Sequence, residues 1–343
     1  MSGRILDGTS EAGAVLDRVA KAVELLAASG KKPRLAAIQA NDDPGTNWYA
    51  RAQEKHCREN GVDLRLVKLA GGAAEGEVVD AVGKAGDDPD VSAVLVFTPL
   101  PDNVSQLRVV EAIKPEKDAE GVHPANLGRL LVASRADPAP CTAMACLRLV
   151  KTARPDLSGA RALVIGRSAT VGKPLALLLL AEHATVTVAH TRSDIRPIMP
   201  EAEVVVAAAG AAGAKWRAYE RRRRRWREGG GVRPVPPNLD PLVSVDMVRR
   251  GAIIVDVGDN DVPLGLDADG AALVDENGEP AMRYAGDVDF DKVKDVAGFI
   301  TRPRGSVGPL TNAFLLWNVA RAALAAAGID PAEAMHAARG PES

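Results

Sequence analysis

The stretch Ala162-Leu-Val-Ile-Gly-Arg-Ser-Ala-Thr-Val-Gly-Lys-Pro174 decides the fold, because an apolar strand runs directly into a turn with two glycines. Gly166 permits a tight turn after the strand, and Gly172 lets the next helix begin close to it. Backbone amides at such a helix start bind phosphate, so we interpret Gly166, Arg167, Ser168 and Gly172 as a dinucleotide-binding turn. A middle glycine is missing at Arg167 and Ser168, and a purely structural turn is the alternative interpretation.

The next apolar strand, 185–189, is followed by His190, Thr191 and Arg192. An NAD-selective site places an acidic residue at this point, against the ribose hydroxyl, and the sequence has none here. A hydroxyl and a guanidinium, with Arg167 nearby, suit a ribose 2′-phosphate through charge-assisted hydrogen bonds. We therefore predict NADP rather than NAD as cofactor, with a solvated loop cation as the alternative for Arg192.

Strands and helices alternate along the chain, which is typical of an α/β fold with parallel sheets covered by helices. The expected strands are 34–38, 63–68, 93–97, 159–165, 185–189 and 204–208. The expected helices are 12–29, 47–60, 75–84, 105–113, 142–152, 244–249 and 312–327. A chain of 343 residues is long enough for two domains.

Composition predicts a cytoplasmic globular protein, with 46% hydrophobic and 26% charged residues. The net charge of −2 gives no general attraction to nucleic acid or to membranes, and we expect neither as a partner. The three cysteines form no spaced metal pair and fit a reducing compartment, so no metal site is predicted.

The segment 213–241 breaks the alternation and reads as an insertion into the second domain. Residues 221–227 contain six arginines, and Trp216, Tyr219 and Trp226 lie around them. We interpret this segment as a solvated helical excursion. Two alternatives are an anion-binding surface whose aromatic rings stack on bases, and arginines that reach the cofactor or a neighbouring subunit.

Further motifs occur in a fixed order over nearly the whole chain. They are Tyr49, Pro99-Leu-Pro101, Pro115-Glu-Lys-Asp-Ala-Glu-Gly121, Asn126-Leu-Gly-Arg129, Pro140-Cys-Thr142, Gly286-Asp-Val288 and Gly305-Ser-Val-Gly-Pro-Leu-Thr311. Together with the turn Gly166-Arg-Ser-Ala-Thr-Val-Gly-Lys-Pro174, they resemble the methylenetetrahydrofolate dehydrogenase/cyclohydrolase family.

This resemblance implies an N-terminal α/β folate domain at 1–146, completed by a C-terminal helix at 310–330. It further implies a Rossmann-like NAD(P)-binding domain at 147–309, a cleft between the two domains, and a homodimer. Tyr49 would stack on the reduced folate, whose binding would also involve Pro99, Leu100, Gly308 and Pro309.

The chain departs from the family pattern at three candidate catalytic or substrate positions. The family's Tyr-x-x-x-Lys is Tyr49-Ala-Arg-Ala-Gln53 here, and residues four apart share a helix face, so an uncharged amide would lie beside Tyr49. Lys55 lies roughly 200° around the helix from position 53 and cannot replace the lysine. Phe97 stands where the family has glutamine, and Glu120 where it has the pterin-binding aspartate.

Hydrolysis of the methenyl product requires proton transfers around a water, which a carboxamide cannot perform near neutral pH. We therefore predict an NADP-dependent methylenetetrahydrofolate dehydrogenase with weak or absent cyclohydrolase activity. The alternatives are the full bifunctional enzyme, a nucleic-acid-binding relative without catalysis, and a Rossmann dehydrogenase that acts on another small acid.

Overall fold

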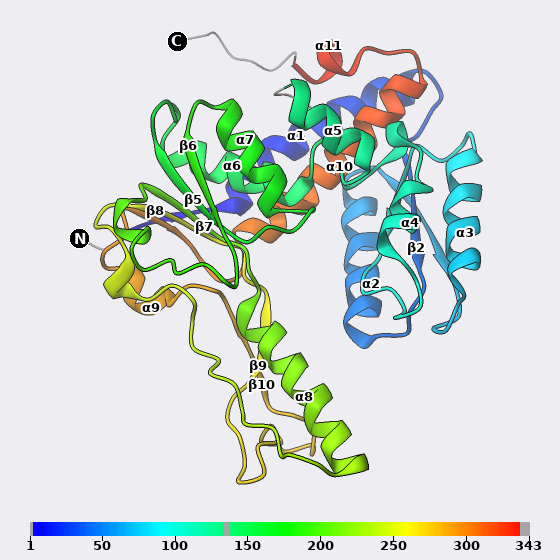
Figure 1. Ribbon diagram of the computed structural model, residues 1–343. Helices are drawn as coiled ribbons and strands as arrows, with labels where there is room; N and C mark the ends of the chain where they lie inside the picture. Colours follow the sequence, from blue (N-terminus) through cyan, green and yellow to red (C-terminus); the bar gives the residue numbers. More distant parts are fainter. Residues whose placement is uncertain (1–2, 134–137, 337–343) are drawn as a thin grey trace. The chain divides into compact units, whose positions relative to one another are not determined.

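The computed structural model describes residues 3–133 and 138–336, and the chain divides into two compact units (Figure 1). The six-stranded unit consists of Met1–Asp7 and Cys146–Val307. The three-stranded unit consists of Gly8–Ala145 and Gly308–Ser343. The predicted α/β fold class with parallel sheets is confirmed.

The six-stranded unit is built on a sheet with strand order β1-β11-β8-β7-β5-β6, in which every neighbouring pair is parallel. Its strands are β1 (Arg4–Leu6), β5 (Arg161–Ile165), β6 (Thr185–Ala189), β7 (Val204–Ala207), β8 (Ile253–Asp256) and β11 (Phe299–Thr301). The central strands β7 and β8 are buried along their whole length, as expected for a parallel sheet covered on both faces.

Helical segments connect these strands. They are α6 (Cys141–Ala153), α7 (Gly172–Ala181), η2 (Met199–Glu201), α8 (Ala211–Gly229), η3 (Val245–Met247) and α9 (Phe290–Val293). The helix expected at 244–249 is only the single turn η3, so that prediction was wrong. The sequence analysis also placed residues 4–6 in the N-terminal domain. In the structure these residues form β1, which pairs with β11, the last strand of the six-stranded sheet in sequence order.

The three-stranded unit has the parallel strand order β3-β2-β4 with helices on both faces of the sheet. Its strands are β2 (Arg34–Gln39), β3 (Asp63–Lys68) and β4 (Ala93–Val96). Its helical segments are α1 (Gly8–Ala28), α2 (Pro44–Glu59), α3 (Glu75–Asp87), α4 (Gln106–Glu111), η1 (Pro115–Lys117), α5 (Pro124–Ala133), α10 (Val307–Ala326) and α11 (Pro331–His336).

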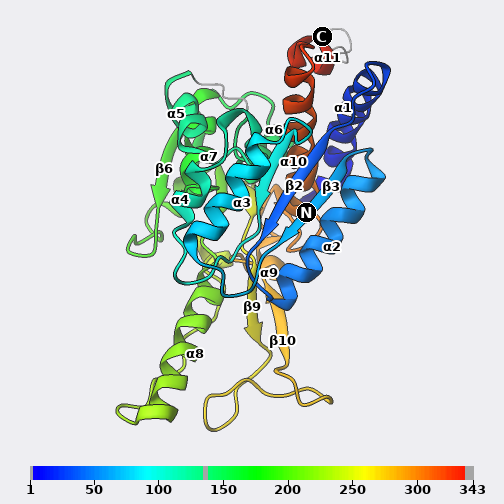
Figure 2. The same cartoon turned by 90° about the vertical axis from the view of Figure 1, so that its right-hand side faces the viewer.

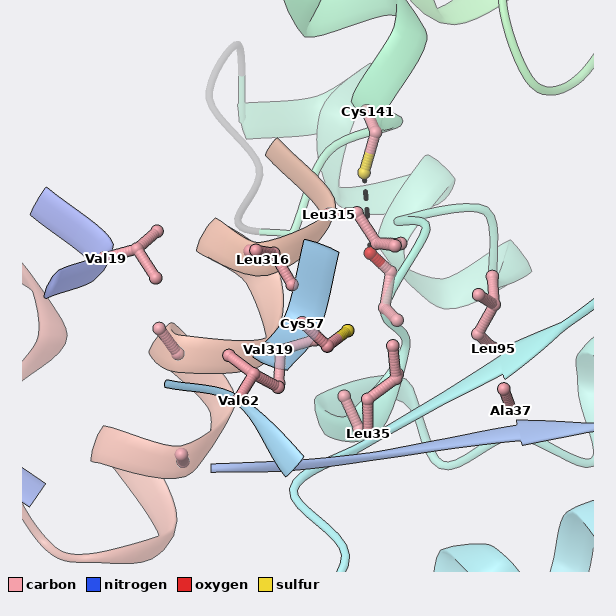
Figure 3. Close-up of a cluster of buried hydrophobic side chains, with 14 of the residues drawn as sticks. Val19, Leu35, Ala37, Cys57, Val62, Leu95, Cys141, Leu315, Leu316 and Val319 are labelled. Carbon is pink, nitrogen blue, oxygen red and sulfur yellow. Dashed lines mark hydrogen bonds between the residues drawn. The ribbon is translucent and has the colours of Figure 1, made fainter. Parts of the chain in front are cut away.

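Alternation along β2 divides the core of this unit into two clusters. Leu35 and Ala37 pack with Leu316 and Val319 of α10, and Figure 3 shows this cluster together with Cys57 of α2. Ala36 and Ile38 point to the other face, where α3 and α4 cover them. Helix α10 therefore completes the core of a unit whose sheet and remaining helices, apart from the short α11, come from the first part of the chain.

An arm extends from the six-stranded sheet, and we define it as residues 211–241 and 260–285 (Figures 1 and 2). It contains α8 and the antiparallel pair β9 (Asn260–Pro263) and β10 (Met282–Ala285). The predicted helical excursion is confirmed by α8. The hairpin that accompanies it, including the loops between β9 and β10, was missed.

Helix α8 packs against the hairpin through its aromatic residues. Trp216 and Tyr219 are buried, with ring centroids 5.4 Å apart, and the Tyr219 hydroxyl donates a hydrogen bond of 2.9 Å to the Gly270 carbonyl. These two rings are therefore core residues of the arm, and the suggestion that they stack on bases was wrong. Within the described residues, no helix combines the length and apolar character that a bilayer crossing requires.

Candidate active site

The two-glycine turn lies at the point where the strand order of the six-stranded sheet reverses. Strand β5 pairs with β6 on one side and with β7 on the other, and ligands bind at such a switch point beyond the carboxyl ends of the strands. Gly166 follows β5 with φ +137°, and a Cβ there would lie 2.3 Å from the Ala208 carbonyl oxygen. A Cβ on Gly172 would lie 2.1 Å from the Gly166 carbonyl oxygen, so both positions require glycine.

The Ser168 side chain stabilises this turn through hydrogen bonds to its backbone. Its Oγ accepts hydrogen bonds from the amides of Val171, at 3.1 Å, and Gly172, at 3.3 Å. The serine thus fixes the start of α7 in place of the missing middle glycine. Arg167 precedes it and is exposed at the mouth of the turn. The close backbone approach and the exposed guanidinium fit a dinucleotide phosphate.

The loop after β6 places further polar groups at the same sheet edge, because β5 and β6 are parallel neighbours with Ile165 opposite Ala189. His190 Nδ1 accepts a hydrogen bond of 3.1 Å from the Arg192 amide, which shapes the loop. Thr191 and Arg192 are exposed. Within the described part of the chain, neither Arg167 nor Arg192 forms an ion pair, so both guanidiniums are available to an anionic ligand.

Asp287 occupies the start of α8 and was not identified as a structural residue from the sequence. Its carboxylate accepts hydrogen bonds from the amides of Ala209, Gly210 and Ala211, at 2.7, 2.8 and 3.0 Å. Asn260 donates to the same carboxylate at 3.2 Å and accepts from the Gly213 amide at 2.8 Å. Buried hydrogen bonds from Asp287, just outside the arm, and from Asn260 within it therefore attach the arm to the rest of the six-stranded unit. The Gly-Asp-Val motif was the available sequence signal.

In the three-stranded unit, Tyr49 and Gln53 lie on one face of α2, as the spacing predicted. Gln53 is only 1% exposed, and its Nε2 donates to the Tyr49 hydroxyl at 2.7 Å. The Tyr49 ring is 38% exposed and meets the Phe97 ring edge-on, with centroids 5.5 Å apart and an interplanar angle of 76°. Burial raises the pKa of Tyr49 to about 12, so the phenol is neutral at physiological pH.

Asn312 of α10 is a member of this site that sequence reasoning missed. Its Oδ1 accepts a hydrogen bond of 2.8 Å from Gln53 Nε2 and lies 3.4 Å from the Tyr49 hydroxyl. The helix was expected to begin at residue 312, whereas it begins at Val307, so Asn312 lies more than one turn inside it. Gly308 and Pro309 lie in the first turn, and Gly308 is one turn before Asn312 on the same helix face.

Phe97 directly follows the buried strand β4 and is 2% exposed, so an apolar ring fills the position where the family has glutamine. Pro99 follows it, and its carbonyl accepts a hydrogen bond of 2.6 Å from Asn41 Nδ2. Leu100 packs against the cluster on the opposite face of the sheet. Phe97 therefore contacts the Tyr49 ring directly, while Leu100 packs in a different part of the core.

Glu120 is the titratable group of this site. Burial, reinforced by the nearby charge of Asp118, raises its pKa to about 7, and its charge in turn raises the pKa of Tyr49. Asp118 is satisfied by its own loop, because its carboxylate accepts from the amides of Gly121, at 2.9 Å, and His123, at 2.8 Å. Glu120 is therefore the carboxyl group that remains for a ligand.

No cluster of metal-binding side chains occurs among the residues that the structure describes. The site chemistry is that of an uncharged aromatic and amide face in one unit and of a basic dinucleotide turn in the other. This combination defines an NAD(P)-binding α/β protein whose second unit offers a planar ligand an aromatic surface.

Family models identify which protein of this class it is. The tetrahydrofolate dehydrogenase/cyclohydrolase catalytic domain matches residues 6–120, and the NAD(P)-binding domain of the same family matches 140–215 and 239–327. The chain therefore belongs to the tetrahydrofolate dehydrogenase/cyclohydrolase family. The residues between the two NAD(P)-domain segments, 216–238, fall inside the arm.

Curated relatives and solved structures agree with this assignment. The chain is 36% identical over 325 residues to the bifunctional protein FolD of Sorangium cellulosum, covering 94% of this chain and 98% of the relative. The FolD structure from Campylobacter jejuni has a TM-score of 0.76 at 29% identity, covering 94% of this chain and 99% of that one. A Trypanosoma brucei methylenetetrahydrofolate dehydrogenase-cyclohydrolase, complexed with NADP cofactor and inhibitor, has a TM-score of 0.79 at 28% identity, with coverages of 95% and 99%.

We predict that Asn312→Ala lowers the free energy of unfolding by about 1–3 kcal/mol, because it leaves the buried Gln53 amide without one of its acceptors. Urea unfolding measures the change. Asn103→Ala, on an exposed side chain of the same unit, is the control and should change stability by less than about 0.5 kcal/mol. Equal effects of the two substitutions would contradict the assigned hydrogen bond.

Proposed function

We propose that this protein oxidises 5,10-methylenetetrahydrofolate to 5,10-methenyltetrahydrofolate by hydride transfer to NADP, with weak or absent cyclohydrolase activity. The observation that carries the proposal is the Tyr49–Gln53–Asn312 hydrogen-bonded group beside Phe97, which offers an aromatic face without a cationic group. Family membership and the named activities of the relatives support the dehydrogenase half.

The residues of the three-stranded unit act on the folate in this proposal. Tyr49 stacks on the folate as a neutral ring, and Gln53 and Phe97 fix the orientation of that ring. Glu120, in its ionised form, accepts hydrogen bonds from the nitrogen edge of the pterin. Hydride transfer mainly requires that the two reacting carbons are held in register and that water is excluded, and these side chains serve both requirements.

The residues of the six-stranded unit hold the cofactor in this proposal. NADP, when bound, supplies the nicotinamide carbon that accepts the hydride. The α7 amides and the close approach at Gly166 and Gly172 suit its pyrophosphate. Arg167, Thr191 and Arg192 suit the 2′-phosphate, since two unpaired guanidiniums lie at one sheet edge among the described residues. This arrangement supports NADP over NAD.

The weak or absent cyclohydrolase activity in this proposal is explained by the side chains at positions 53 and 97. Gln53 is neutral and donates to Tyr49 and Asn312, so it can neither take up nor release a proton near neutral pH. Phe97 removes a second polar group from the same place. Neither Gln53 nor Phe97 can supply a base or a cation to a water that attacks the methenyl carbon.

The full bifunctional enzyme is the second candidate, favoured by the bifunctional name of the relative at 36% identity. The group available to replace the lysine is His56, one turn beyond Gln53 on α2, whose enclosed Nε2 has no hydrogen-bond partner among the described residues. Burial lowers the pKa of His56, so its imidazole is neutral and could serve as a base.

We also propose a homodimer that resides in the cytoplasm. All three cysteines are free and buried, which is compatible with a reducing compartment. The homodimer rests on the family resemblance.

In a coupled assay with methylenetetrahydrofolate and NADP, we predict that methenyl product accumulates and decays no faster than it does spontaneously. Gln53→Lys alone should leave this decay unchanged, because Phe97 still excludes the second polar partner, whereas Q53K/F97Q should accelerate it. Rapid enzymatic decay in the wild type would contradict the loss of hydrolysis and would favour the bifunctional candidate. Absence of NADPH formation would contradict the dehydrogenase itself.

We predict that Arg192→Glu raises the KM for NADP by about 10- to 100-fold, because it replaces a charge-assisted hydrogen bond with repulsion. The KM for NAD should change little. Arg250→Glu is the matched control. Arg250 is exposed and precedes β8, so it lies at the amino ends of the parallel strands, whereas Arg192 follows the carboxyl end of β6. Steady-state kinetics with both cofactors distinguish these outcomes, and equal effects on NADP and NAD would contradict the 2′-phosphate role.

We predict that the KM for folate rises by about tenfold between pH 8 and pH 6 if only ionised Glu120 binds the pterin. The raised pKa of about 7 means that this carboxyl gains its proton over that range, whereas a glutamate with the ordinary pKa of 4.5 would stay ionised. Glu120→Gln should bind more weakly at pH 8 and show a flat profile. A wild-type profile as flat as that of the variant would show that ionisation of Glu120 does not govern binding.

A further inference from the structure

Helix α10 contacts the loop that carries Glu120 through a buried amide. Asn318 of this helix is only 3% exposed, and the next residue, Val319, belongs to the hydrophobic cluster of Figure 3. The Asn318 Nδ2 donates a hydrogen bond of 2.9 Å to the carbonyl of Ala119, the residue before Glu120. Burial of an amide costs free energy unless the amide is hydrogen-bonded, so Asn318 favours this one position of the loop.

A second residue holds the same stretch of backbone. Cys141, at the start of α6, donates from Sγ to the Ala119 carbonyl at 3.5 Å, and Asn318 Nδ2 lies 3.3 Å from that sulfur (Figure 3). The backbone amide of Cys141 donates to the Glu120 carbonyl at 3.2 Å. The peptide groups on both sides of the Glu120 Cα are therefore held, one by α10 and α6 together and the other by α6.

The loop also meets the sheet and the segment before α6. The Ala119 amide donates to the Val94 carbonyl at 3.2 Å. Gly121 has φ +75°, and a Cβ at this position would lie 2.3 Å from the carbonyl carbon of Ala139. Of the contacts named for this loop, the hydrogen bond from Asn318 is the one that comes from the C-terminal part of the chain.

The carboxyl group of Glu120 has no comparable support of its own. Among the described residues it forms neither a hydrogen bond nor an ion pair. Asp118 in the same loop, Tyr49 of α2 and Cys141 of α6 are the titratable groups that interact with it electrostatically. None of these three carries a positive charge that would attract the carboxylate. The direction of the Glu120 side chain therefore depends on where its backbone is held.

Helix α10 thus contacts both parts of the candidate folate site. Asn312 accepts a hydrogen bond of 2.8 Å from Gln53, beside the aromatic ring. Asn318 lies roughly 9 Å further along the same helix axis and holds the backbone before Glu120. Because a hydrogen-bonded helix keeps this spacing, α10 links the position of the aromatic surface to that of the carboxyl group.

We propose that Asn318 is a positioning residue for the folate, because its hydrogen bond to the Ala119 carbonyl keeps the Glu120 carboxyl where the nitrogen edge of the pterin meets it. This inference rests on the role of Glu120 in the proposed function. Asn318 itself neither touches the folate nor takes part in hydride transfer. A carboxylate that accepts hydrogen bonds from a planar ligand has to be held to within about 0.5 Å, and a buried amide supplies such a constraint.

Asn318→Leu tests the proposal, because leucine has a similar size and suits the apolar surroundings but cannot donate a hydrogen bond. The KM for methylenetetrahydrofolate at pH 8 should rise by about tenfold, and the KM for NADP should change by less than about twofold. Val319→Ala is the matched control, since Val319 is 0% exposed on the same helix and its truncation lowers stability. Equal effects of the two substitutions on the folate KM would overturn the proposal.

The pKa of Glu120 in the free protein is a readout that a loss of stability alone does not move. Carboxyl NMR of isotope-labelled glutamate measures it, and Glu120→Gln assigns the signal. The wild-type group should titrate near its raised pKa of about 7. In N318L the loosened loop admits water to the carboxyl, so its pKa should fall below about 6, whereas V319A should keep the wild-type value. An unchanged pKa in N318L would show that Asn318 does not hold this group.

Cys141→Ala separates the two donors to the Ala119 carbonyl. It removes the thiol and keeps the backbone amide, and a thiol is a weak donor, so the folate KM should rise less than in N318L. A larger rise would assign the positioning to Cys141 instead of Asn318.

The NMR titration contains neither folate nor NADP, so its result does not depend on the proposed reaction. If Glu120→Gln leaves the folate KM at pH 8 unchanged, the proposed role of Glu120 fails and the role of Asn318 in folate binding fails with it. If E120Q weakens folate binding while N318L changes neither the KM nor the pKa, only the inference about Asn318 is overturned.

Discussion

The buried amide of Gln53 is the interaction on which the candidate folate site depends. Its Nε2 donates to the Tyr49 hydroxyl within α2 and to Asn312 of α10, so one side chain both orients the aromatic ring and joins two helices that are far apart in sequence. A lysine at this position would carry a charge into the same enclosed space, and burial of an unpaired charge is costly. The surrounding residues suit a neutral group, because the phenol of Tyr49 is neutral and Phe97 is apolar. The three form a consistent uncharged set.

Much of this could be predicted from the sequence, since the relevant signals are local. The spacing of Tyr49 and Gln53 placed them on one helix face, and the run from Ala162 to Pro174 gave the strand, turn and helix that the structure contains. The glycine requirement is also local, because Gly166 and Gly172 lie within one turn of chain. Family membership was predicted from the order of the motifs and is confirmed by both domain matches.

The features that escaped prediction depend on contacts between distant segments. Asn312 is an ordinary polar residue near a helix start until α10 packs against α2, and nothing in its own neighbourhood marks it. Strand β1 is three residues long and gains its place only by pairing with β11. Trp216 and Tyr219 looked available for stacking because their cover, the hairpin around Gly270, comes from about fifty residues further on. The roles assigned to the cofactor and folate residues stay predictions until they are measured.

The chain passes between its two units three times, at residues 7–8, 145–146 and 307–308. During synthesis the N-terminal segment emerges first, yet the core around Leu35 lacks Leu316 and Val319 until the last part of α10 has left the ribosome. The three-stranded unit, most of which is synthesised first, is consequently the last to complete its hydrophobic core. The hydrophobic core around Leu35 therefore stays incomplete while the whole six-stranded unit is translated.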